Sequence, residues 1–449
     1  MLSFLQTITR PMFGTFEREE YKKFLRMGLI FTTIIGAYWT MRGLKKAIFF
    51  KLADATQIPF AKTASIFFLF PVVILYNKLL DRYPRERMFY LLSIFYGTAL
   101  ILFAIAFYFV QATPEVVAAR TGFASFGTTF LGYAWYVFVE SFGSLVVALF
   151  WAIASDTTSP DSAKKGFSLV VAIGQMGGIF LPDLIGRLPK WFGLETDMAP
   201  VFICGVFALL LFLLMRWFLS ATPKHLLTHA FEAHNTQTIE KEQEPGFFEG
   251  LKILVKNNYL LGIFAVISFF EIIVTIFDYN FDCKAQAVLG KGAALTEYTL
   301  TYASYVNIVA LICLLLGVSN ITRYLGVNVA LALMPLIMAG AIFGFLTYDN
   351  LNFFFWLMVS SKAINYALNG PALKQLYIPI SKDARFKSQA WIETFGSRGA
   401  KEAGSVFNMC IAPFVLGFIG FAFVGLWFFA ALFLGKTYNK AIADKKLIC

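Results

Sequence analysis

The chain has 449 residues, of which 58% are apolar, 18% aromatic and only 14% charged. A set of soluble domains is excluded, because soluble folds could not bury so large an apolar fraction, which includes 52 phenylalanines. The formal net charge of +11 is compatible with basic cytoplasmic loops and with attraction of anionic solutes. Composition therefore predicts an all-α integral membrane protein with many spans.

Twelve apolar segments predict about 12 transmembrane helices, since a helix needs about 20 apolar residues to cross a bilayer. They lie near 27–43, 62–80, 88–111, 133–154, 166–185, 199–220, 259–281, 299–321, 326–347, 351–368, 388–411 and 412–435. A long polar stretch separates the first six from the last six. We therefore expect an N-terminal cytoplasmic tail (1–26), a six-helix bundle (27–220), a cytoplasmic linker (221–258), a second six-helix bundle (259–435) and a C-terminal cytoplasmic tail (436–449).

Short motifs recur between the two predicted halves in the same order. The matched positions are Arg82-Tyr83 with Arg323-Tyr324 (241 apart), Asp161 and Lys165 with Asp383 and Lys387 (222 apart), and Lys45 with Lys284 (239 apart). These echoes predict an internal duplication with pseudo-symmetric halves. Repeats in transporters commonly build a substrate site at their interface.

Basic residues gather in the N-terminal tail, the loop after the second helix, the linker and the C-terminal tail. With twelve helices these segments share one side, so both termini are expected to be cytoplasmic. The connection between the first two helices departs from this bias, because it contains Lys45, Lys46, Lys51 and Lys62. These lysines are expected to serve something besides topology.

Charges within the first and fourth helices point to a polar pathway. Lys45 and Lys46 could snorkel to the headgroups, but neighbours on a helix point about 100° apart, so at least one should face the bundle interior. Glu140 has apolar residues on both sides, and intramembrane acids usually pair with a base or face a polar pathway.

The end of the seventh helix concentrates polar groups at Asp278, Asn280, Asp282 and Lys284. Asp278 and Asp282 are four residues apart and so share a helix face. These residues are candidates for substrate binding; the alternative is an interfacial helix end whose charges pair with one another.

A second basic region follows the tenth helix, where Gly370-Pro371 predicts a break or bend. Its candidate binding residues are Lys374, Lys387, Arg398 and Lys401. Arg398 and Lys401 are three residues apart among glycines, and Arg can bind phosphate through a bidentate fork. Basic groups spread over four helices indicate a site for a polyanion.

Other motifs favour no enzyme, metal or cofactor. His225, His229 and His234 have no acid or cysteine to complete a metal set, and they indicate a solvated linker. The run GQMGG at 174–178 indicates close helix packing rather than a phosphate loop. The five cysteines are scattered singly and indicate buried apolar positions.

Three long motifs resemble the ATP/ADP translocases of obligate intracellular bacteria and plastids. The segment EREEYKKFLRMGLIFTTIIGAYWTMRGLKKAIFF is similar to that family's opening and places Arg42 and Lys45 on its Arg and Lys. The segment ESFGSLVVALFWAIASD places Glu140 on the family's intramembrane Glu. The segment LYIPISKDARFKSQAWIETFGSRGAKEAGS matches a late motif, with Lys387, Arg398 and Lys401 on its basic positions.

The chain departs from the family pattern near the substrate. Lys46 replaces an Asp, Asn280 stands at a Glu position, and Gly370-Pro371-Ala372-Leu373-Lys374 replaces Asp-Pro-Thr-Lys-Glu. At the end of the seventh helix, Lys284 and Gln286 match the family pattern. These departures leave the preferred nucleotide open.

The resemblance implies a fold like that of the major facilitator superfamily and alternating access between two six-helix halves. It further implies a monomeric carrier in the bacterial inner membrane that contacts lipid, takes no nucleic acid, and exchanges ATP for ADP, with phosphate as a further candidate cargo. The alternative is a proton-coupled importer or exchanger of another nucleotide (GTP, UTP or other triphosphates) or NAD, in which Asp278 or Glu140 carries the proton. From another class, a receptor-like relative would bind nucleotide without moving it.

Overall fold

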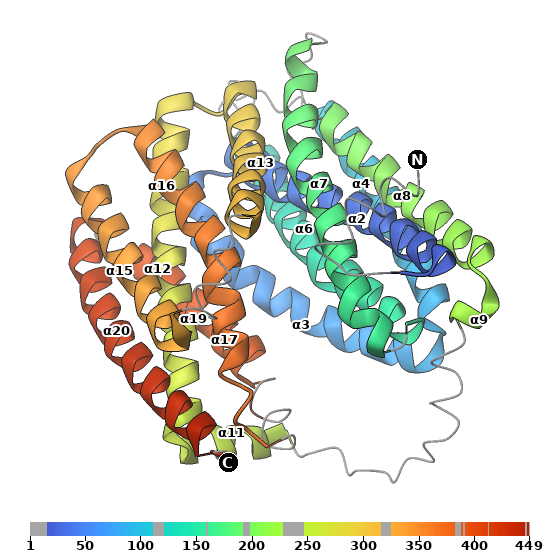
Figure 1. The fold of residues 1–449 in the computed structure, drawn as a ribbon. Coiled ribbons are helices and arrows are strands. Elements are labelled where there is room, and N and C mark those ends of the chain that lie inside the picture. Colours follow the sequence, from blue (N-terminus) through green and yellow to red (C-terminus); the bar gives the residue numbers. More distant parts are fainter. Residues whose placement is uncertain are drawn as a thin grey trace. The chain divides into compact units, whose positions relative to one another are not determined.

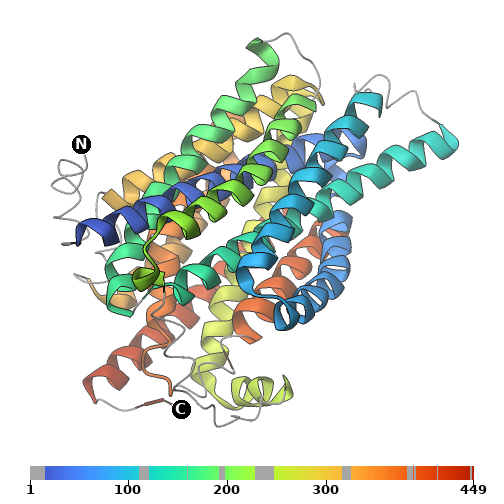
Figure 2. The ribbon, with the colours of Figure 1, turned by 90° about the vertical axis from the view of Figure 1, so that its right-hand side faces the viewer.

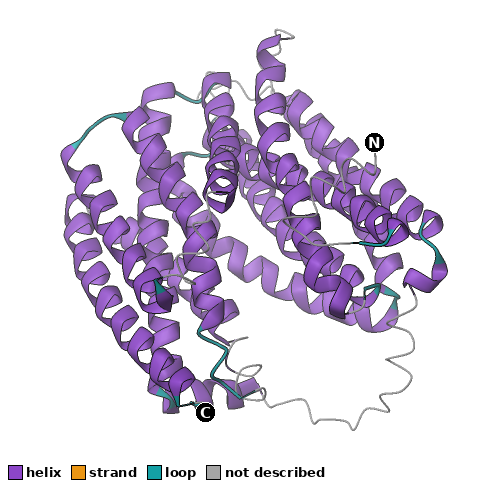
Figure 3. Ribbon diagram, viewed as in Figure 1, coloured by secondary structure: helices purple, strands orange, loops and turns teal. Residues whose placement is uncertain are grey.

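The computed structural model describes residues 16–110, 121–158, 160–191, 198–227, 247–315, 325–381, 388, 391–411, 413–444 and 447–448. Within these ranges the structure consists of helices joined by short loops and turns, and no strand occurs in them (Figure 3). The prediction of an all-α fold is therefore confirmed.

The chain divides into two compact units. Unit 1 comprises Met1–Asp54, Ala64–Glu240 and Leu289–Tyr305, and unit 2 comprises Ala55–Thr63, Lys241–Val288 and Val306–Cys449. Three helices cross these boundaries, one of them by its last residue alone, so a piece of each predicted half groups with the other unit. The predicted domain limits of 27–220 and 259–435 stay a prediction.

Unit 1 is built from the helices of the first half (Figure 1). They are α2 (Arg18–Leu52), α3 (Ile58–Arg82, whose first turns belong to unit 2), α4 (Arg85–Val110), α6 (Gly122–Asp156), α7 (Pro160–Trp191), α8 (Met198–Ala221) and the short α9 (Lys224–Leu227). Helix α2 packs along α7 and also contacts α6 and α8 (Figures 1 and 2). It is the most buried helix of this unit, with apolar side chains inward on most of its turns.

Unit 2 contains the helices of the second half and the short segment before α3. They are η1 (Ala55–Gln57), α11 (Phe247–Lys256), α12 (Asn258–Leu289), α13 (Ala293–Leu315, whose first turns belong to unit 1), α15 (Gly326–Thr347), α16 (Leu351–Ile364), η3 (Asn365–Asn369), α17 (Gly370–Gln375), η4 (Trp391–Gly396), α19 (Ser397–Cys410) and α20 (Pro413–Ala443). Helix α15 packs against α20 and α16.

Among the described residues, nine helices are long and apolar enough to cross a membrane. They coincide with the first seven, the ninth and the twelfth predicted spans. The other three predicted spans, 299–321, 351–368 and 388–411, fall on α13, α16 and α19. Of the first of these spans, residues 316–321 lie outside the described part. Helices α16 and α19 have only 14 residues each, and both lie next to π-helical segments.

The first helix begins earlier than the sequence predicted. Helix α2 starts at Arg18 rather than near residue 27, and its first turns contain Lys23 and Arg26. Lys23 donates hydrogen bonds to the backbone oxygens of Thr157 and Leu226, and Arg26 donates to that of Ala221 at 2.6 Å. The carbonyls of Thr157 and Ala221 belong to the ends of α6 and α8, where a cation is favoured by the helix dipole. Lys23 and Arg26 thus stabilise the additional first turns of α2 through hydrogen bonds to the ends of neighbouring helices.

The break or bend predicted at Gly370-Pro371 is not a break, because the helix continues through these residues. A π-helical segment, η3, links α16 to α17, and Pro371 stands at the start of α17. A proline lacks the backbone N–H that an α-helix interior needs, and a wider π turn is one way to accommodate that loss. A second π-helical segment, η4, leads into α19.

Close packing of α2 on α7 depends on the glycine run that the sequence singled out. A Cβ at Gly177 would lie 2.0 Å from the backbone oxygen of Thr32, and one at Gly174 would lie 2.2 Å from the ring of Phe31. The helix-packing interpretation of GQMGG is confirmed.

We expect Gly177→Ala to destabilise the protein, because the clash is with backbone and α2 and α7 must separate. The expected cost is about 1–3 kcal/mol, measured as a fall in the thermal unfolding midpoint of the detergent-solubilised protein. Gly127→Ala is the matched control, since Gly127 is exposed on α6 with no atom within 4 Å of its added Cβ. Equal midpoints for the two variants would contradict the packing role.

Candidate functional site

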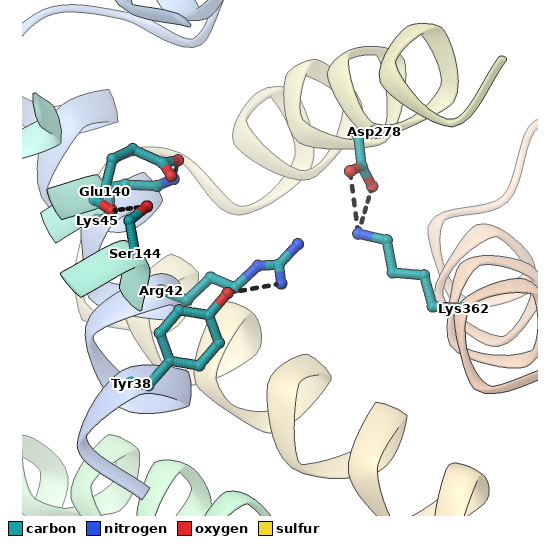
Figure 4. Close-up of polar contacts among 7 residues, drawn as sticks. All are labelled: Tyr38, Arg42, Lys45, Glu140, Ser144, Asp278 and Lys362. Carbon is teal, nitrogen blue, oxygen red and sulfur yellow. Dashed lines mark hydrogen bonds and ion pairs between the residues drawn. The ribbon is translucent and has the colours of Figure 1, made fainter. Parts of the chain in front are cut away.

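Unit 1 contains an ion pair between its first and fourth long helices. Lys45 on α2 is 6% exposed, and its ammonium forms a salt bridge with the carboxylate of Glu140 on α6 (Figure 4). The same ammonium lies 4.3 Å from the ring centroid of Tyr136, a distance at which the ring face attracts a cation. The burial of Lys45 rules out snorkelling for this side chain, and the intramembrane Glu140 has the basic partner that the sequence led us to expect.

Arg42 lies one turn before Lys45 on α2 and is held by aromatic groups. Its guanidinium carbon is 5.0 Å from the ring centroid of Trp39, and it donates a hydrogen bond of 3.4 Å to the hydroxyl of Tyr38 (Figure 4). Stacking on Trp39 and bonding to Tyr38 fix the plane of the guanidinium, so its fork is oriented before any anion binds. Lys46 is half-buried.

Unit 2 contains a second buried ion pair, and one partner was missed by the sequence analysis. Asp278 on α12 accepts from Lys362 on α16, with Nζ 2.7 Å from Oδ1 and 3.0 Å from Oδ2 (Figure 4). Lys362 is a single charge in the apolar segment FFFWLMVSSKAINYAL, so the argument applied to Glu140 could have found it.

Two of the other polar groups at the end of α12 have partners outside this group of residues. Lys284 forms a salt bridge with the exposed Asp349, just before α16. The amide of Asn280 donates to the backbone oxygen of Ile276 at 2.8 Å. Asp282 is buried on α12.

A third group joins α12 to α19. Glu271, also missed from the sequence, accepts a 2.8 Å hydrogen bond from Ser397 and lies 3.4 Å from the ammonium of Lys401. Lys401 is exposed and Arg398 is half-buried. On the same helix, Glu402 accepts a hydrogen bond from Thr63. The predicted basic pair of α19 thus adjoins an acid of α12.

Two of the predicted binding residues remain. Lys374 is exposed on α17, whereas Lys387 lies outside the described residues. Also outside the described residues are two linker histidines, His229 and His234, and three repeat positions, Arg323, Tyr324 and Asp383. The structure therefore does not test the interpretations of these residues.

What these groups can do chemically follows from their charges. Each paired lysine offers three N–H donors, which a phosphate oxygen can accept as well as a carboxylate can. An anion that binds such a lysine must compete with an acid that is already in place. The arrangement suits reversible binding of phosphate groups.

Comparison with known proteins decides the family. A family described as "TLC ATP/ADP transporter" matches residues 4–354. The chain belongs to the TLC ATP/ADP transporter family. Its relatives include "ADP,ATP carrier protein 1" of Rickettsia bellii, 25% identical over 96% of each chain, and "ADP,ATP carrier protein 1, chloroplastic" of Arabidopsis thaliana, 23% identical over 98% of this chain and 78% of the relative. The resemblance stated from the sequence is confirmed, with the chain a divergent member.

Solved structures show the fold of this TLC family member. A bacterial homologue of the iron transporter ferroportin in its inward-facing state matches with a TM-score of 0.62 at 14% identity, covering 93% of this chain and 98% of that one. The inward-open xylose transporter XylE from E. coli matches with a TM-score of 0.59 at 15% identity, covering 92% and 95%. The major-facilitator-like fold is therefore confirmed, and the protein is a membrane transporter rather than an enzyme.

Loss of the acid in the first pair should destabilise the protein. In Glu140→Gln the buried ammonium of Lys45 loses its negative partner, and we expect a cost of about 2–3 kcal/mol. The thermal unfolding midpoint of the purified full-length protein measures this loss. Asp183→Asn, which breaks the more exposed Asp183–Arg187 pair on α7, is the control and should cost under about 1 kcal/mol. A Glu140→Gln variant as stable as the control would contradict the claim that Glu140 stabilises the buried ammonium of Lys45.

Proposed function

We propose that this protein exchanges ATP for ADP across the bacterial inner membrane by alternating access. The observation that carries the proposal is the ion pair of the buried Lys45 with the partly exposed Glu140 in a chain of the TLC ATP/ADP transporter family. The pair gives the membrane interior a cation that a nucleotide phosphate can bind and an acid against which that phosphate competes. The relatives named ADP,ATP carrier proteins support ATP and ADP as the cargo.

The proposed substrate-binding residues are described separately for each unit. In unit 1 they are Arg42 and Lys45, with Glu140 as the competing acid. In unit 2 they are the predicted residues Asp278, Asn280, Lys284, Lys374, Arg398 and Lys401, to which Lys387 is added from the sequence alone. Arg398 and Lys401 on α19 suit a phosphate best, because guanidinium and ammonium groups stand one turn apart beside glycines.

The topology and surroundings are part of the same proposal. We place both termini on the cytoplasmic side, because the basic N-terminal tail, linker and C-terminal tail would then follow the positive-inside rule. We also propose two six-helix halves (27–220 and 259–435), contact with the lipid bilayer and a monomeric carrier. Light scattering of the purified protein would test the last point.

Counter-exchange in liposomes tests the proposed activity. We expect uptake of labelled ATP to require unlabelled ADP or ATP inside the vesicles, because an exchanger couples each inward step to an outward one. Uptake that ignores internal ADP but rises when the outside is acidified would contradict exchange and favour the proton-coupled importer. Intact binding without any uptake would favour the receptor-like alternative.

We expect Lys45→Gln to raise the dissociation constant for ATP by about tenfold or more, because a hydrogen bond to a charged group is lost. Nucleotide binding to the purified protein measures the change. Lys78→Gln is the control, since Lys78 is exposed near the end of α3; Lys51 is unsuitable because it is buried. Equal small changes in the two variants would contradict a binding role for Lys45.

A further inference from the structure

The Asp278–Lys362 pair is built as tightly as the Lys45–Glu140 pair, although the family resemblance points to no role for Lys362. The ammonium contacts both carboxylate oxygens of Asp278, at 2.7 and 3.0 Å. The two side chains are 16% (Asp278) and 10% (Lys362) exposed, so the pair is shielded without being fully enclosed. Figure 4 shows the lysine extended from α16 toward α12.

Stability does not account for a pair at this depth. Two charges removed from water lose hydration that their mutual attraction barely repays, and apolar residues of similar size often stabilise a core as well or better. Intramembrane charges are therefore expected mainly where a protein handles charged cargo. Lys362 is the only charged residue of α16, where it follows the apolar run 353–359 and two serines.

The internal repeat relates this pair to the first one. Glu140 and Lys362 are 222 residues apart, the same separation as Asp161 from Asp383 and Lys165 from Lys387. Helix α6 is the fourth long helix counted from α2, and α16 is the fourth counted from α12. Each unit therefore contains one ion pair between its first and fourth long helices.

The positions of the acid and the base are reversed between the two pairs. In unit 1 the base is on the first helix and the acid on the fourth, whereas in unit 2 the acid is on the first helix and the base on the fourth. A duplicated sequence would give equivalent helices the same charge. What the two repeats share is a lysine held by an acid, whichever helix supplies it, and this points to a common use for the lysine.

The local backbone of Lys362 supports such a use. The π-helix η3 begins at Asn365, three residues after Lys362, and the amide of Asn369 donates to the side-chain oxygen of Asn365 at 2.8 Å. π-helical insertions are frequent at functional sites, because they re-aim side chains within a helix. Polar groups thus continue along α16 and η3 from Lys362 to Asn369.

We propose that Lys362 binds a phosphate group of the transported nucleotide and that Asp278 is the acid which this phosphate displaces. The proposal rests on the proposed nucleotide exchange and adds to it a binding residue in unit 2. Lys362 then has the role in α16 that Lys45 has in α2. No covalent step is involved: the three N–H donors of the ammonium pass from carboxylate oxygens to phosphate oxygens.

Substitution of a competing acid and substitution of a binding base should have opposite effects on the dissociation constant for ATP. Lys362→Gln should raise the dissociation constant for ATP about tenfold or more, and Lys362→Arg should restore much of the affinity. Asp278→Asn should lower the dissociation constant, since the phosphate no longer competes with a carboxylate. The loss in Lys362→Gln should be larger for ATP and ADP than for AMP.

The experiment measures binding of ATP, ADP and AMP to the purified full-length protein, with thermal unfolding of each variant. Asp278→Asn/Lys362→Gln leaves no buried unpaired charge, so it should unfold near the wild-type midpoint yet bind ATP as weakly as Lys362→Gln. Lys256→Gln, on the exposed end of α11, is the matched control.

If the pair has only a structural role, the variants should show a different pattern of ATP binding. The proposal is overturned if Asp278→Asn and Lys362→Gln both weaken ATP binding to the same extent, or if the double variant binds ATP like the wild type. Failure of the wild-type protein to bind or exchange any nucleotide would instead contradict the proposed function, so the two failures are distinguishable.

Discussion

Burial of charge in an apolar membrane interior is the constraint on which the rest of this structure depends. Lys45 and Lys362 are both buried, and each is stabilised by an acid from another helix of its own unit. Removal of either partner leaves an uncompensated charge that hydrocarbon cannot solvate. A substrate with several negative charges is therefore matched to the protein, because it can replace the acids as partners of the lysines.

The surrounding helices are arranged so that these charges can be held in place. Helix α2 lies close to α7 because Gly174 and Gly177 leave room for it, and Lys23 and Arg26 attach its first turns to the ends of α6 and α8. This rigid setting positions Arg42 and Lys45 along one helix. In unit 2, two acids of α12, Asp278 and Glu271, pair with lysines of α16 and α19, and π-helical segments lie next to Lys362 and Arg398.

The apolar runs predicted the helical membrane fold because length and hydropathy alone decide which segments can span a bilayer. An interior position for Glu140 was predictable, since an acid with apolar flanks is expected to pair with a base or to face a polar pathway. Lys362 and Glu271 were not predicted, although each is a single charge in an apolar run and the reasoning used for Glu140 applies to both. The π-helices and the early start of α2 could not be predicted, since both depend on tertiary partners that local sequence does not specify.

The central claim is that nucleotide phosphates take the place of acids at buried lysines. A structure of the full-length protein with ATP bound, determined in lipid nanodiscs, tests it most directly. The account predicts a phosphate oxygen within about 3 Å of the Lys45 ammonium, with Glu140 moved away from it. A nucleotide bound elsewhere, with Lys45 still paired to Glu140 and Lys362 still paired to Asp278, would contradict the account.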